Sequence, residues 1–132
     1  MNKKILFVVI AVSSIFLYGM NYYISPSGSD SNDGSVSRPW RTIHHAAQRV
    51  SAGDTVYVLP GTYNEAIKPG YQAGIFSNVS GTSTAPIKFI CKEKWECKVR
   101  TEPPPLPDWQ RIIYSAWDNR GDYVTIQGFD VS

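Results

Sequence analysis

Short β-prone runs, separated by loops rich in Gly, Pro, Ser and Asn, make up most of the chain after its first 20 residues. Apolar and β-branched residues dominate three strong runs, at 54–59, 86–91 and 123–131. Weaker runs lie at 22–24, 62–63 and 112–114. The chain therefore reads as an all-β protein with long polar connections.

The strong runs begin at a spacing that indicates a structural repeat. They start near Val56, Ile87 and Val124, which are 31 and 37 residues apart. No helical pattern separates them, and this disfavours a βαβ fold, in which a helix must connect parallel strands. In a stack of coils, by contrast, each strand's backbone groups find partners in the coils above and below. The pattern predicts a solenoid.

One stretch before the strong runs has the period of a helix. Its apolar residues recur at offsets of 0, 3, 6, 7 and 10, on one helical face: Trp40, Ile43, Ala46, Ala47 and Val50. Thr42 is the predicted N-cap, and Gly53 the predicted C-terminal stop. A short helix with a single apolar stripe must cover an apolar surface.

The first 20 residues have the composition of a targeting segment. Lys3 and Lys4 precede an apolar stretch, 5–20, which is interrupted only by two serines. This pattern predicts a signal peptide and a secreted protein, because the apolar stretch is shorter than the about 20 residues that a membrane-spanning helix needs. No clear small-x-small triplet precedes Asn21, so an uncleaved N-terminal anchor is the alternative. Only in that case would the chain keep a membrane span.

The charge balance excludes one class of partner. The chain has 13 Lys and Arg residues and 11 Asp and Glu residues. Lys3 and Lys4 account for the whole excess, so residues 21–132 carry no formal net charge. A neutral chain without a basic run gives no support for a nucleic-acid partner.

Cys91 and Cys97 are the only two cysteines, and they enclose five residues. In an exported protein we expect such a pair to form a disulfide that ties down one small loop. A metal site is the weaker interpretation, because four ligands are needed and neither histidine lies nearby in the sequence.

Few residues are candidates for chemistry. Asp118, Asp122 and Asp130 lie near the C-terminal end, where turn and loop roles are far commoner than calcium binding. His44 and His45 would point about 100° apart on a helix, and we expect both to be solvated.

Other tempting residues have a structural interpretation too. Lys88 and Lys92 have no acidic cluster nearby in the sequence, so we expect surface lysines. The loop 29–34 is acidic but lacks the ligand spacing of an EF-hand, which indicates a turn-rich surface loop. Aromatic residues can stack on sugars but more often fill a core, the role we expect for Trp40, Tyr63, Trp95, Trp109, Trp117 and Tyr123. We assign no catalytic residue and no metal ligand.

A series of sequence blocks resembles the opening of secreted right-handed parallel β-helix proteins. The strongest is 53–63, GDTVYVLPGTY, and the others, in the same order as in that group, are 22–28, 32–34, 38–43 with 46–47, 80–87 and 123–129. The resemblance implies that the helix at about 43–50 caps the open end of the β-helix. It also implies an organisation into a signal peptide at 1–20, an N-terminal strand, loop and capping helix at 21–53, and the first coils at 54–132.

Within that group the chain is most similar to the pectate lyases of polysaccharide lyase family nine, on the layout of Asp108-Trp109, 122–123 and 128–131. Such enzymes hold Ca²⁺ with an Asp cluster to acidify the C5 proton of a uronate, which a Lys or Arg removes before β-elimination. The resemblance therefore implies an acidic polysaccharide substrate and a Ca²⁺ cofactor for the full-length parent. No position here matches the family's Asp cluster or base, so we expect the fragment to be inactive alone.

Two alternatives stand beside an exported polysaccharide lyase represented by its N-terminal part. One is a non-catalytic β-helix surface protein or carbohydrate-binding protein, because the opening blocks belong to the fold and not to one substrate. The other is a complete small domain of 132 residues. We rank it last, because the chain ends at a strand without the polar cap that a solenoid needs.

Overall fold

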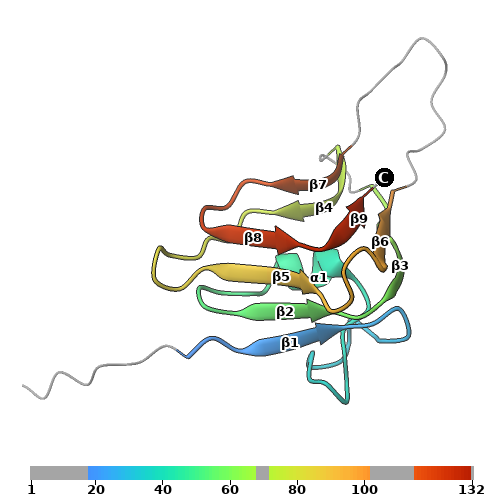
Figure 1. Ribbon diagram of the computed structural model, residues 1–132, viewed down its shortest axis with the longest axis horizontal. Coiled ribbons are helices and arrows are strands. Elements are labelled where there is room, and N and C mark those ends of the chain that lie inside the picture. The colour runs from blue at the N-terminus through green and yellow to red at the C-terminus, as the bar shows by residue number, and fades with distance from the viewer. Residues whose placement is uncertain (1–17, 68–71, 102–114, 132) are drawn as a thin grey trace, which may run out of the picture.

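The computed structural model describes residues 18–67, 72–101 and 115–131. Within these ranges the chain forms nine strands and one short helix (Figure 1). In chain order they are β1 Asn21–Ile24, α1 Ile43–Ala47, β2 Thr55–Val58, β3 Gly61–Asn64, β4 Ala73–Ser77, β5 Ile87–Cys91, β6 Cys97–Arg100, β7 Ser115–Asn119, β8 Val124–Gln127 and β9 Phe129–Val131.

The strands form three sheets, and every pairing in them is parallel. The first sheet has the order β1-β2-β5-β8, the second β3-β6-β9 and the third β4-β7. The chain passes from one sheet to the next and then returns one level higher, as Figure 1 shows. This is the predicted right-handed parallel β-helix, in which backbone groups are satisfied between coils.

Alternating side chains of the first sheet point into a common core. Val56 and Val58 of β2 are fully buried, and they lie in register with Phe89 and Cys91 of β5. Ile24 of β1 extends the same inward row. The period-2 alternation of apolar residues therefore decides which face of each strand points into the core.

The helical stripe is buried as predicted, but the helix is shorter than the stripe. Ile43, Ala46 and Ala47 lie in α1, while Trp40 and Val50 are buried outside it. Thr42 is the N-cap, and its hydroxyl accepts from the His45 N–H. The buried residues of α1 join the core, and the helix packs against β4, which agrees with a capping role.

The prediction that Gly53 ends the helix is wrong. The chain leaves the helix at Gln48, whose side-chain amide donates to the Phe76 carbonyl at 2.6 Å. Gly53 instead adopts a φ of +90° in the turn that enters β2, and its N–H donates to the Ala85 carbonyl of the next coil. The positive φ explains why glycine occupies this position.

The strong runs at 54–59 and 86–91 contain β2 and β5, whereas the run at 123–131 divides into β8 and β9. The division falls at Gly128, whose φ of +82° turns the chain from the first sheet into the second. The weak run at 112–114 lies outside the described residues. Strands β4, β6 and β7 carry no strong β pattern and were not predicted.

The two ends of the first sheet differ. Beside β1, the Tyr23 N–H donates to Gly34, and the Ser25 N–H donates to Trp40, so the loop covers that edge. At the other end, Ile126 of β8 lies in register with the core residue Phe89 but is 39% exposed.

Met20, which directly precedes β1, is bound to the first coil. The Met20 N–H donates to Asp54 Oδ1 at 2.8 Å, and the Met20 carbonyl accepts from the Thr55 N–H. Most of the predicted signal peptide lies outside the described residues. Within those ranges, no helix has the length and hydropathy needed to cross a membrane.

Candidate functional site

The three aspartates near the C-terminal end do not meet. Asp118 forms an ion pair with Arg120 at 2.9 Å, and Asp130 forms one with Arg100 at 3.2 Å. Asp122 is exposed. Among the described residues, no three His, Cys, Asp or Glu side chains gather as metal ligands.

The acidic loop at 29–34 has a structural role at Asp30. Its carboxylate accepts hydrogen bonds from the N–H groups of Arg41 and Thr42, both at 2.9 Å, and from the Thr42 hydroxyl at 2.7 Å. Burial raises the pKa of Asp30, but these hydrogen bonds outweigh burial and leave the pKa below its ordinary value. Asp30 thus anchors the loop to the N-cap of α1.

The expectation of solvated histidines is wrong, because both rings are half-buried and make specific contacts. His44 Nδ1 accepts from the Phe76 N–H at 3.3 Å. The His45 ring meets the Trp40 ring edge-on at 5.2 Å, and burial lowers the pKa of His45. The two rings therefore contact different parts of the structure: His44 meets β4, and His45 meets Trp40.

The aromatic residues divide between core and surface. Trp40 and Tyr63 are buried as predicted, and Trp117 packs against the core. The core prediction is wrong for Trp95 and Tyr123, which are 57% and 58% exposed, respectively. Both have positive φ angles, and both lie in connections between strands and not within a strand. Trp109 lies outside the described residues.

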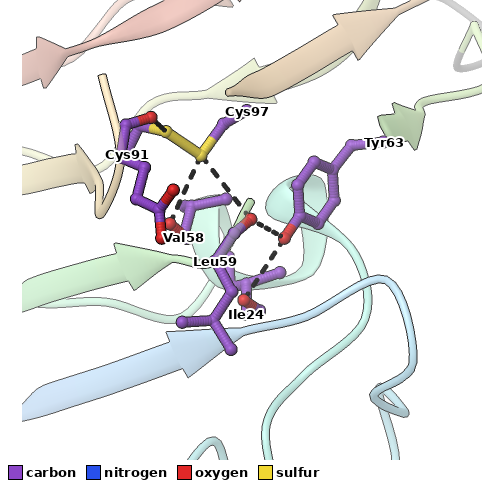
Figure 2. The surroundings of a disulfide bond; sticks show 7 residues. Ile24, Val58, Leu59, Tyr63, Cys91 and Cys97 are labelled. Carbon is purple, nitrogen blue, oxygen red and sulfur yellow. Dashed lines mark hydrogen bonds between the residues drawn. A yellow bond between two sulfur atoms is a disulfide. The ribbon is translucent and has the colours of Figure 1, made fainter. Parts of the chain in front are cut away.

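A disulfide joins Cys91 at the end of β5 to Cys97 at the start of β6, with the two Cα atoms 5.8 Å apart (Figure 2). Cys97 Sγ lies 3.3 Å from the Val58 carbonyl oxygen. A disulfide sulfur carries no hydrogen, so this is a packing contact and not a hydrogen bond. The bridge closes the loop 92–96 at the corner between the first and second sheets.

Tyr63 packs into the same corner. Its hydroxyl donates to the Leu59 carbonyl at 2.6 Å and also lies 3.3 Å from the Ile24 carbonyl, as Figure 2 shows. Burial raises the pKa of Tyr63 well above its ordinary value, and the negative charge of Glu65 adds to the effect. The ring therefore stays neutral and supports the turn between β2 and β3.

A polar hollow of about 90 Å³ lies beside β3 and is lined by Pro26, Arg41, Thr42, Thr62, Tyr63, Asn64 and Glu65. Ligand pockets usually enclose about 300–1,000 Å³. The hollow is thus large enough for water or a small polar group and too small for a sugar ring.

The outward face of the first sheet carries two tyrosines that the sequence analysis did not single out. Tyr23 and Tyr57 lie in register on β1 and β2, with ring centroids 5.5 Å apart. Lys92 Nζ lies 5.0 Å from the centroid of the Tyr57 ring. Lys88 and Lys92 are exposed, as predicted. Because Tyr57 stands between the inward residues Val56 and Val58, the alternation alone could have placed it outward.

The chain is similar in sequence to several known proteins. Residues 26–80 match the family model described as a protein of unknown function (DUF1565). An uncharacterized protein of Bacillus subtilis (strain 168), YwoF, is 40% identical over 113 residues, which are 83% of this chain and 22% of that protein. Pectate lyase L of Dickeya dadantii (strain 3937) is 29% identical over 111 residues, which are 84% of this chain and 26% of that protein.

Two solved structures share the fold. A rhamnogalacturonan lyase superposes with a TM-score of 0.70 at 29% sequence identity, over 86% of this chain and 28% of that one. Pectate lyase Pel9A superposes with a TM-score of 0.60 at 26% identity, over 85% and 28%. The chain is a pectate-lyase-like β-helix protein.

This pectate-lyase-like β-helix spans between 22% and 28% of the length of these four relatives. The similarity extends over most of the described coils, so this chain and its relatives share the architecture of those coils. In the described part of the chain, the architecture holds a disulfide corner, a small polar hollow and a tyrosine-bearing sheet face.

Proposed function

We propose that this chain forms the N-terminal coils of an exported polysaccharide lyase, which cleaves an acidic, pectate-like polysaccharide by calcium-assisted β-elimination. The observation that carries the proposal is the superposition on two polysaccharide lyases, with TM-scores of 0.70 and 0.60. The sequence similarity to a pectate lyase over 84% of the chain supports it independently.

The described acids do not fit a calcium site. Calcium takes six to eight oxygen ligands, whereas Asp118 and Asp130 are each paired with an arginine. Asp30 is occupied by two backbone N–H groups and a hydroxyl. We therefore assign the catalytic Asp cluster and the base to a part of the parent protein beyond the described coils, and no catalytic step to a described residue.

The alternative is a non-catalytic β-helix that binds carbohydrate. The observation that favours it is the outward pair of Tyr23 and Tyr57, with Lys92 over the Tyr57 ring. Aromatic rings and ammonium groups can hold an acidic sugar without cleaving it.

A lyase assay on this chain and on the longer protein that contains it tests the proposal. Both receive polygalacturonate with calcium or with a chelator, and the ultraviolet absorbance of the new unsaturated sugar end is followed. We expect calcium-dependent activity in the longer protein alone. Inactivity of both, on alginate and chondroitin as well, would favour the binding protein. Strong activity of this chain would contradict the assignment of the catalytic site beyond the described coils.

Export is tested separately, by locating the protein in cells and culture medium. We expect the protein in the medium without its first residues, because 1–20 has the composition of a signal peptide. Retention of the whole chain in the membrane fraction would support the uncleaved anchor instead.

A further inference from the structure

The outward side chains of the first sheet stand in rows that run across neighbouring strands. Tyr23 and Tyr57 occupy one row across neighbouring strands, and Ile90 of β5 continues that row. Thr55 and Lys88 occupy the adjacent row. Neighbouring strands lie about 4.8 Å apart, so the two tyrosines stand side by side on this face. The two tyrosine rings are half-buried and tilted by 30° to each other.

The charge on this face has one sign. Its outward-pointing strand residues include a lysine and no acid: Asn21, Tyr23, Thr55, Tyr57, Lys88, Ile90, Thr125 and Gln127. Lys92 follows β5 and adds a second ammonium group above the Tyr57 ring. Within the described ranges, neither Lys88 nor Lys92 has a carboxylate at ion-pair distance. Both charges are therefore available to an anionic ligand.

The disulfide corner holds part of this array in place. The Lys92 N–H donates to the Val58 carbonyl at 2.9 Å, so the backbone of Lys92 stays attached to β2. The Cys91–Cys97 bridge closes the loop that begins with Lys92 (Figure 2). A binding group that is fixed before the ligand arrives loses less conformational entropy on binding.

We propose that Tyr23, Tyr57, Lys88 and Lys92, hereafter the tyrosine–lysine face, bind the chain of an acidic polysaccharide. The sugars contact the exposed parts of the tyrosine rings, and the uronate carboxylates pair with the two ammonium groups. The face holds the polymer beside the coils and takes no part in bond cleavage. It shares the class of substrate with the proposed function but does not require that the protein be a lyase.

Binding measured on the full chain in the presence of a chelator tests this site without calcium-dependent cleavage. The probes are polygalacturonate and its methyl-esterified form, which has the same backbone without the charge. We expect the free polymer to bind more tightly, and salt to weaken its binding. Lys92→Gln should lower the affinity about threefold, the effect of losing one exposed ion pair. Tyr57→Leu, which keeps apolar bulk at the position, should also lower it.

Lys98→Gln is the matched control. It removes the same charge from an exposed lysine on β6, in the second sheet, and should leave the affinity unchanged. Equal losses in Lys92→Gln and Lys98→Gln would show general charge attraction and overturn the proposal. Equal binding of the two polymers, or no binding, would overturn it as well. A lyase assay can fail while this assay succeeds, and the reverse, so the two proposals are separable.

Discussion

The Glu65 carboxylate, just after β3, accepts a hydrogen bond from the backbone N–H of Ile43, the first residue of α1, at 2.7 Å. Glu65 is only 2% exposed. The first N–H groups of a helix have no partner within the helix, and here a residue of the first coil supplies one. The bond connects the capping helix to the coil that it covers.

Substitution of Glu65 should therefore weaken the whole N-terminal cap. We expect Glu65→Ala to lower the free energy of unfolding by about 2 kcal/mol, because a buried backbone donor loses its acceptor. Urea denaturation followed by circular dichroism measures this. Glu96→Ala, which removes an exposed carboxylate, should change stability by less than about 0.5 kcal/mol. Similar values for both variants would contradict the role given to Glu65.

Tyr63 predicts a loss of stability at alkaline pH. Burial raises its pKa in the folded protein, so above about pH 10, the ordinary tyrosine value, the unfolded chain ionises first. The stabilisation that the neutral, buried Tyr63 provides is thus complete below about pH 10 and declines as the pH rises further. We expect Tyr63→Phe to cost about 1 kcal/mol at neutral pH, from the lost bond to Leu59, and to lose less stability at alkaline pH than the wild type. Urea denaturation at a series of pH values measures both proteins. Equal losses of stability with rising pH in the wild type and in Tyr63→Phe would contradict the prediction.

The disulfide should stabilise the fold modestly, because it closes a short loop. A closed loop of this size reduces the entropy of the unfolded chain by an amount worth about 2 kcal/mol. We expect the double substitution Cys91→Ser and Cys97→Ser to lower the free energy of unfolding by that amount. Denaturation of the wild type with and without a reductant provides the control, since reduction should reproduce the loss. A stability unaffected by either change would refute the estimate.

The contacts of Met20 predict where the signal peptide is cleaved. Its backbone N–H and carbonyl are both bonded to the first coil, through Asp54 and Thr55. We therefore expect cleavage before Met20, within the segment 1–20 and not at its end, because removal of Met20 would leave the Asp54 carboxylate, which is 6% exposed, without this partner. Mass spectrometry of the secreted N-terminus measures this. A mature chain that begins at Asn21 or later would contradict the expectation.

Local patterns were sufficient where the burial of a strand alternates along its length. Val56 and Val58, then Ile87 and Phe89, predict β2 and β5 because a pleated strand turns every second side chain inward. The stripe from Trp40 to Val50 predicts the buried residues of the cap for the corresponding reason in a helix. The resemblance of these blocks to β-helix proteins then supplied the fold class.

Strand β4 could not be predicted in that way. All five of its residues are buried, so it has no alternation. Gly74, within the strand, is a β-disfavoured residue, but a Cβ there would lie 2.5 Å from the Glu65 carbonyl oxygen. It would also lie 2.5 Å from Thr101 Cγ2, which follows β6 in the next coil. The glycine is needed because both its own coil and the next one approach here, and the local sequence does not contain that information.

The sequence by itself determined which side chains of each strong strand face inward, where the cap lies and which two cysteines are available to pair. The tertiary structure alone decided that Tyr23 meets Tyr57, that Lys92 lies over that ring and that Trp95 is exposed. The physical reason is that the pleat and the helical period are properties of the local backbone. The register between strands far apart in the chain is set by how whole coils stack, and the tyrosine–lysine face exists only in that register.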